Sequence, residues 1–207
     1  MLTKAAYKLN KYFFKLLTVV GSLLFTNPGW GQSHFLKKLV PHHAKLQHGG
    51  GIGFLSAGIG YSNRNQKLEG DLIYGYVPSG SMGIEIHSAT IKLQWIPLTT
   101  ITAGDFFLKP LVTGVLVNHS FGDQYFGFKP ENYPYDYYKF PTSFNTALLL
   151  GSQVGIHFPR AKNVERISLY YELLSFDREI ISLVNNPKSI KMDDILTLGF
   201  GVKMSFR

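Results

Sequence analysis

Two adjacent His–Ser pairs, His87-Ser88 and His119-Ser120, have the residue types that could carry out chemistry in this chain. A serine hydroxyl activated by an imidazole base performs nucleophilic acyl transfer, and Glu172 or Asp123 could orient the histidine. Neighbouring residues of a strand point to opposite faces, so neither pair can act as base and nucleophile unless a bulge intervenes. Both pairs and Glu172 are therefore catalytic candidates, but the expected geometry argues against an enzyme.

Four histidines, His34, His42, His43 and His48, gather in the N-terminal part of the chain. Their spacing matches no familiar set of metal ligands, so we predict a solvated segment and no metal site. We predict no cofactor either.

An aromatic cluster between residues 125 and 140 is the most unusual feature of the sequence. Such side chains could stack on a glycan, contact lipopolysaccharide or another protein, or cover the mouth of the fold. Packing of the loop on its own scaffold is the simpler interpretation. The candidate binding residues are Tyr125, Phe126, Tyr133, Tyr135, Tyr137 and Tyr138.

The elements that must position these residues are strands, because apolar residues recur with period two. In the last segment, residues 196–206, the even positions are all apolar, whereas the odd positions are Thr, Gly, Gly, Lys and Ser. Turn signals such as Pro78-Ser79-Gly80 and Asn185-Asn186-Pro187 separate similar segments. Seven strands are predicted, at 50–62, 68–76, 82–96, 106–120, 144–158, 166–184 and 196–206.

The apolar phase changes within 82–96, since Ile84 and Ile86 are even while Ile91, Leu93 and Trp95 are odd. A bulge near His87-Ser88 would restore the register.

Alternation alone does not say which face is inside. A soluble calycin-like barrel buries its apolar face, whereas a membrane barrel turns that face outward and encloses the small and charged residues. Strands of at least ten residues, aromatics near strand ends and sparse mid-strand charges favour the membrane barrel. The predicted inward charges include Glu69, Asp71, Lys92, Glu172 and Lys203, which should pair into a structural network.

Residues 1–31 have the pattern of a cleavable signal peptide: lysines up to Lys15, an apolar run from Leu16 to Phe25, and then Asn27-Pro28. The run of about ten apolar residues is too short for a membrane-spanning helix, which needs around 20. Cleavage is expected after Gly31, which leaves one domain over residues 32–207.

Composition excludes several classes of function. The net charge is +8, but four of the lysines lie in the leader, so the mature chain is nearer +4 and has no basic run. We therefore predict no nucleic-acid binding. The chain has no cysteine, which rules out disulfides and thiolate metal sites, and its 21 glycines and 14% aromatic residues suit a sheet protein.

The stretch from Ile195 to Phe206 resembles the C-terminal assembly signal of bacterial outer-membrane proteins, although Arg207 follows where such chains usually stop. The junction at residues 29–32 and the run from Tyr133 to Tyr138 resemble small uncharacterised Bacteroidetes barrels. The resemblance implies outer-membrane location, contact with lipid and lipopolysaccharide, and help from the barrel assembly machinery. Lipid A deacylases of similar size space their His and Ser two apart, a pattern absent from the predicted strands.

Barrels of this type have an even number of strands, so seven imply an eighth, at about 36–47 or within Tyr135 to Thr142. The first position would place 121–142 and 185–192 outside the cell as loops. We thus predict an all-β, single closed antiparallel up-and-down transmembrane β-barrel, monomeric and without an open pore, whose role is structural or binding. The alternatives are a lipid A deacylase or acyltransferase and a soluble secreted calycin-like barrel.

Overall fold

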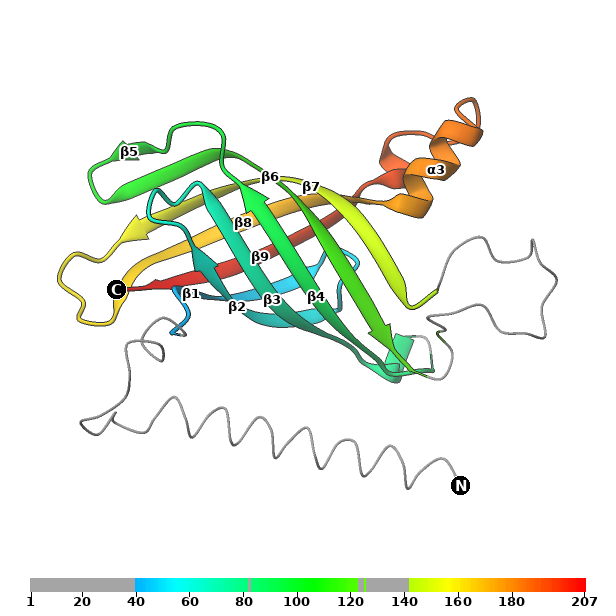
Figure 1. Cartoon of the computed structure of the whole chain (residues 1–207), viewed down its shortest axis with the longest axis horizontal. Helices are drawn as coiled ribbons and strands as arrows, with labels where there is room; N and C mark the ends of the chain where they lie inside the picture. Colours follow the sequence, from blue (N-terminus) through cyan, green and yellow to red (C-terminus); the bar gives the residue numbers. More distant parts are fainter. Residues whose placement is uncertain (1–39, 82, 123–124, 126–141) are drawn as a thin grey trace, which may run out of the picture. The chain divides into compact units, whose positions relative to one another are not determined.

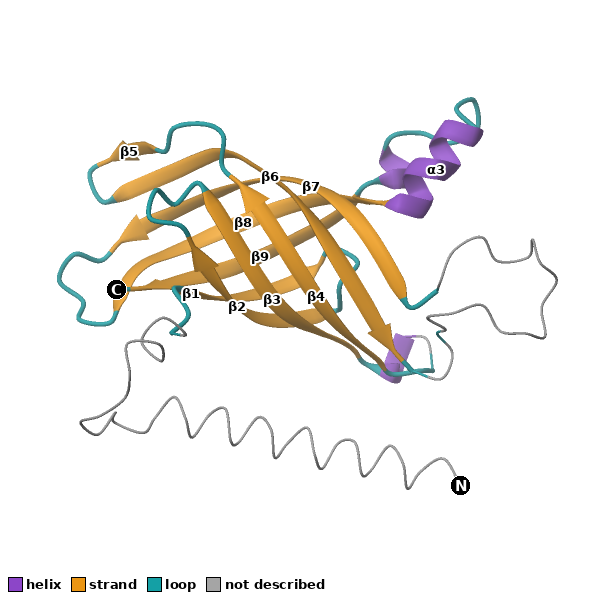
Figure 2. Ribbon diagram, in the orientation of Figure 1, coloured by secondary structure: helices purple, strands orange, loops and turns teal. Residues whose placement is uncertain are grey.

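The computed structural model describes residues 40–81, 83–122, 125 and 142–207, and in these ranges the chain forms a β-barrel (Figure 1). The strands are β1 (His43–Gly49), β2 (Leu55–Ser62), β3 (Leu68–Val77), β4 (Ile86–Trp95), β5 (Ile101–Ala103), β6 (Phe106–Phe121), β7 (Phe144–His157), β8 (Val164–Phe176) and β9 (Thr197–Phe206). The other elements are the helix α3 (Asp177–Asn185) and two short 3₁₀ turns, η1 (Ser79–Ser81) and η2 (Asp193–Ile195) (Figure 2).

Eight of the nine strands form the closed ring, each antiparallel to its sequence neighbours. β4 pairs directly with β6, and β9 returns to pair with β1, while β5 pairs only with the start of β6. The predicted closed up-and-down barrel of eight strands is confirmed. The strand that completes it is β1, at the N-terminal of the two positions considered. The other position, Tyr135 to Thr142, lies outside the described residues except for Thr142.

The two ends of the barrel differ. At the terminus end, where β1 begins and β9 finishes, the connections are 63–67, 96–105 and 158–163. At the loop end they are 50–54, 78–85, 122–143 and 177–196, the last containing α3. The 122–143 and 177–196 connections therefore share the end opposite the termini. Among the described residues no helix is long and apolar enough to span a membrane.

The distribution of polar and apolar side chains is the reverse of that in a water-soluble protein. Strand residues that point outward are mostly large and apolar and half-exposed, as in Leu72, Ile91, Leu148, Leu169 and Leu198. Those that point inward include seven buried Lys, Asp and Glu side chains together with Gln, Asn and Ser. The predicted assignment of faces, with the apolar side outward, is what the structure has.

Three strand predictions were wrong in detail. Residues 50–54 form a loop and not the start of β2, because four of the five residues from Gly49 to Gly53 have a positive φ that only glycine adopts easily. The strand predicted over 166–184 ends at Phe176, and α3 follows. The strand predicted over 82–96 begins at Ile86, so Ile84 lies before it.

Register shifts in the barrel wall lie in β6 and at the start of β8, and not near His87-Ser88. β4 pairs with β3 and β6 in unbroken register through His87 and Ser88. The register with β7 shifts between Lys109 and Val112, where β6 has one more residue than its partner. Pro110, which has no N–H to donate, lies in this bulge.

Candidate functional site

Buried charges fill the barrel interior toward the terminus end. We call this set the lumenal network: Lys45, Glu69, Asp71, Lys92, Lys109, Glu172 and Lys203, each at most 5% exposed. They come from β1, β3, β4, β6, β8 and β9, so the network links six of the eight barrel strands across the lumen.

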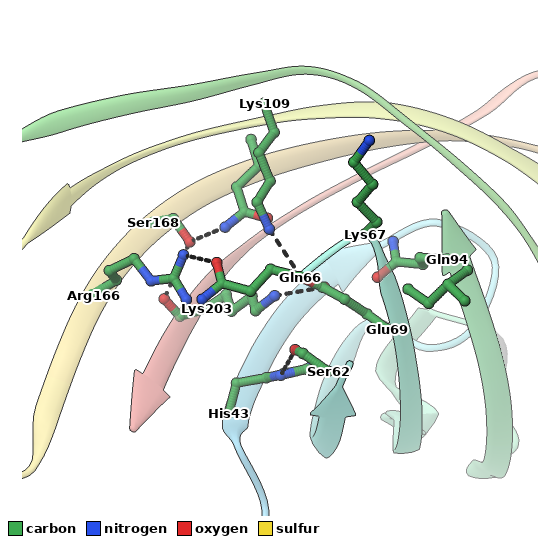
Figure 3. Close-up of polar contacts among 12 residues, drawn as sticks. His43, Ser62, Gln66, Lys67, Glu69, Gln94, Lys109, Arg166, Ser168 and Lys203 are labelled. Atoms are coloured by element: carbon green, nitrogen blue, oxygen red, sulfur yellow. Dashed lines mark hydrogen bonds and ion pairs between the residues drawn. The ribbon is translucent and has the colours of Figure 1, made fainter. Parts of the chain in front are cut away.

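Glu69 on β3 binds the most cations. Its carboxylate accepts hydrogen bonds from Lys203 Nζ at 2.5 Å and Lys109 Nζ at 3.0 Å (Figure 3). Lys45 Nζ lies 3.9 Å from the same carboxylate. One carboxylate thus joins β3 to β6 and β9, and its negative charge offsets several ammonium groups that would otherwise be buried unpaired.

Asp71, two residues further along β3, binds the β1 side chains. His43 Nε2 lies 2.6 Å from Asp71 Oδ1, and Lys45 Nζ donates to Oδ2 at 2.6 Å. Lys45 also donates to Gln94 Oε1 at 2.5 Å, which extends the contacts to β4. His43 is fully buried, so Asp71 supplies the imidazole with the polar partner that it needs away from water.

Glu172 on β8 is the third carboxylate of the lumenal network. Lys92 Nζ donates to its carboxylate at 2.5 Å and Gln94 Nε2 at 2.9 Å. Lys92 also donates to Gln47 Oε1, which accepts from the Tyr170 hydroxyl at 3.3 Å as well. The hydrogen bonds are continuous from Tyr170 to His43, and every charged member has an oppositely charged partner. This arrangement suits a structural role, in which ion pairs and hydrogen bonds link the strands across the lumen.

Apolar side chains pack together inside the barrel near its loop end. Ile52 packs with Ile73, Leu116, Leu149 and Leu174 in a buried cluster. Ile52 belongs to the cork loop, residues 49–54, which folds inward over the mouth.

Hydrogen bonds to the neighbouring strands hold the cork loop in place. Gly50 N donates to Leu198 O, Phe54 N donates to Tyr76 O, and Ser88 Oγ donates to Ile52 O at 2.5 Å. A Cβ at Gly75 would lie only 1.9 Å from the Ile52 carbonyl oxygen. Glycine at position 75 therefore allows the loop to approach β3 this closely.

The structure separates the members of the first His–Ser pair. Ser88 is buried and points inward to the cork loop, whereas His87 lies on the outer side with Tyr76 and has its Nδ1 2.5 Å from the Tyr74 hydroxyl.

The second pair is separated in the same way. His119 lies against the outward rings of Phe121 and Phe144, while the Ser120 hydroxyl is 3.5 Å from the inward Asn118 amide oxygen. Ser88 and Ser120 are opposite each other across β4 and β6. Glu172 is bound to Lys92 and Gln94, so those of the candidates that the structure describes form no Ser–His–carboxylate triad.

The candidate binding residues fall almost wholly outside the described part of the chain. Tyr125 is described, and its N–H donates to Gly122 O at 3.0 Å. The remaining members, Phe126, Tyr133, Tyr135, Tyr137 and Tyr138, lie outside it, as does Asp123.

Sequence analysis missed Lys45 and Lys109 as members of the lumenal network, and it wrongly placed His43, which is fully buried, in a solvated segment. His43 and Lys45 lie in the strand whose position was left open. Lys109 alternates with the outward Phe106 and Leu108, so the pattern before Pro110 could have identified it. Among the described residues no group of His, Cys, Asp and Glu has the arrangement of a metal site.

Comparison with known proteins does not extend this description. No family model matches the chain, and neither a curated protein nor a solved structure matches it.

Proposed function

We propose that the chain is a bacterial outer-membrane β-barrel protein with a closed lumen, monomeric, and structural or binding in role. The observation that carries the proposal is the reversed polarity of the barrel: leucine, isoleucine and aromatic side chains cover the outer wall, while seven charged side chains are buried inside. Such an outer wall is costly in water and favourable in the hydrocarbon of a bilayer.

Strand length supports the same proposal. β3, β4 and β9 have 10 residues each, and β6, β7 and β8 have 16, 14 and 13. A tilted strand needs about 9 to 11 residues to cross the hydrocarbon.

Outward aromatic residues lie near both ends of the barrel, as expected of the aromatic girdles at the two membrane surfaces. Phe54, Phe121 and Phe144 are exposed at the loop end. Tyr61, Trp95 and Phe106 are exposed at the terminus end.

In this proposal residues 1–31 direct export, and the segment from Ile195 to Phe206 is recognised by the barrel assembly machinery. The terminus end faces the periplasm, and the loop end, with α3 and the 122–143 connection, faces the outside. The recognition surface, including contact with lipopolysaccharide, is then at the loop end. The lumenal network and the cork loop leave the protein without an open pore.

Cell fractionation combined with a gel-shift assay tests the proposal. We expect the protein in the outer-membrane fraction, released only by detergent, and with different gel mobility before and after boiling. A variant lacking residues 1–31 should remain inside the cell. Recovery of the folded protein from a soluble fraction without detergent would contradict the proposal and favour the soluble calycin-like alternative.

A further inference from the structure

A groove of about 720 Å³ lies on the wall of the barrel where β3, β4, β6 and β7 are adjacent. The exposed surface of its lining is mostly apolar. The outward side chains that line it are Tyr61, Leu68, Leu93, Trp95, Thr113, Val115 and Leu148.

One missing side chain deepens the groove. Gly70 is outward on β3, directly opposite Tyr61 on β2 and Leu93 on β4. A Cβ there would meet only Leu93 Cδ2, at 3.6 Å. Glycine thus leaves a hollow between two large neighbours, and this hollow is part of the groove.

A turn that carries two cations adjoins the groove at the terminus end of the barrel. Asn63 and Leu68, which both line the groove, flank the turn Arg64-Asn65-Gln66-Lys67. Arg64 and Lys67 are exposed, and the turn has no carboxylate. Neither side chain pairs with an acidic group elsewhere in the described ranges.

We propose that this groove binds one anionic phospholipid, with an acyl chain along the apolar lining and the phosphate beside Arg64 and Lys67. The inference rests on the proposed membrane location, in which the groove belongs to the leaflet at the terminus end. The apolar lining suits an acyl chain, and the cationic turn at its edge suits a phosphate.

Charge also argues for a lipid over a second copy of the chain. Two copies related by a twofold axis along the membrane normal would bring their Arg64 and Lys67 side chains to the same depth on facing surfaces. Like charges would then oppose each other, whereas an anionic headgroup neutralises them.

Trp95 provides the probe for a test. It lines the groove, and the only other tryptophan is Trp30, in the expected leader. A chain with Trp30→Phe, in which Trp95 is the only tryptophan whether or not the leader is removed, is reconstituted in phosphatidylcholine vesicles with a minor fraction of lipid that has brominated acyl chains. Bromine quenches Trp95 fluorescence on contact, so the quenching reports which lipid occupies the groove.

We expect brominated phosphatidylglycerol to quench Trp95 more strongly than brominated phosphatidylcholine at the same fraction, with a preference of about fivefold for each cation. Arg64→Gln combined with Lys67→Gln should abolish this preference. Gly70→Leu should reduce it by narrowing the groove. Ala57→Leu, on the outward face of β2 but outside the groove, should retain it.

The outcomes separate the two proposals. Equal quenching by both lipids, unchanged in Gly70→Leu, overturns the lipid site but leaves the barrel in the membrane. If Trp95 becomes less quenched by brominated lipid as the protein-to-lipid ratio rises, and cross-linked dimers form, then a second copy of the chain and not a lipid occupies the groove. No quenching by a bilayer composed wholly of brominated phosphatidylcholine would contradict both the lipid site and the proposed function.

Discussion

Lys203 on β9 donates a 2.5 Å hydrogen bond to Glu69 on β3, although 134 residues separate them in the sequence. Lys109 on β6 reaches the same carboxylate. The two lysines come from different sides of the ring, so this contact forms only when the barrel is closed. Glu69 therefore reports on closure, and its removal should affect stability more than any surface charge.

Glu69→Gln should lower the free energy of unfolding by about 3 to 5 kcal/mol, because Lys109 and Lys203 would remain buried without their shared anion. Urea unfolding of the reconstituted protein, followed by Trp95 fluorescence, measures the change. The matched control is Glu85→Gln, an exposed carboxylate that accepts one hydrogen bond from Tyr76. It should change stability by no more than about 0.5 kcal/mol. Equal effects of the two substitutions would contradict a stabilising role for the lumenal network.

Gly75→Ala should loosen the cork loop, because the new Cβ would collide with the Ile52 carbonyl oxygen and the Ser88 hydroxyl. Overpacking of this kind costs about 1 to 3 kcal/mol. Faster hydrogen exchange at the Gly50 and Phe54 amides, which both donate bonds that hold the loop, would show where the strain is relieved.

Gly70→Ala is the control for this substitution, since it makes the same chemical change on the same strand with only ordinary contact to Leu93. Similar exchange rates in the Gly75→Ala and Gly70→Ala variants would show that the cork loop does not depend on close approach to β3.

Ser88→Ala distinguishes a structural serine from a nucleophile. Loss of its bond to Ile52 O should lower stability by about 0.5 to 1.5 kcal/mol. The acyl profile of extracted lipid A, measured by mass spectrometry on overexpression, should be the same for the wild type and the variant. A profile that changes with the wild type and reverts with Ser88→Ala would contradict this assignment and favour the acyl-transfer alternative.

Leu169→Lys should destabilise the protein in a bilayer by about 2 to 4 kcal/mol, because the ammonium group would enter the hydrocarbon in the middle of β8. Leu169 is 60% exposed, so the same substitution would be nearly neutral if the barrel wall faced water. Val184→Lys on α3, at a position that is 72% exposed, is the control that should be tolerated. Equal tolerance of both substitutions in vesicles would place Leu169 outside the hydrocarbon.

The barrel was predictable from the sequence because its two faces differ so consistently. In β9 the outward Leu198 and Phe200 alternate with Gly199 and Gly201, and the inward charges of β3 and β8 fall on the opposite phase from the outward Leu72 and Leu169. The sequence also predicted that the inward charges would pair with one another, since an unpaired buried charge is too costly. Which lysine binds which carboxylate depends on barrel closure and could not be derived from local pattern.

The errors occurred where another local preference replaced the strand pattern. The apolar residues Ile180, Ile181, Leu183 and Val184 have helical spacing, and the Glu179 carboxylate accepts a bond from Phe176 N at the start of α3. That signal was present in the sequence. The bulge at Pro110 was harder to predict from the sequence. Its one extra residue reverses the apolar phase only over the short segment of β6 that precedes the bulge.

The absence of cysteine allows the most direct test of the central claim, since any introduced cysteine is unique. A nitroxide attached at Leu169→Cys, in vesicles, should collide frequently with oxygen and rarely with a water-soluble nickel chelate in an electron paramagnetic resonance experiment. The same label at Arg64→Cys, in the exposed turn, should show the reverse. A label at position 169 that is freely accessible to the nickel chelate would contradict a lipid-facing outer wall.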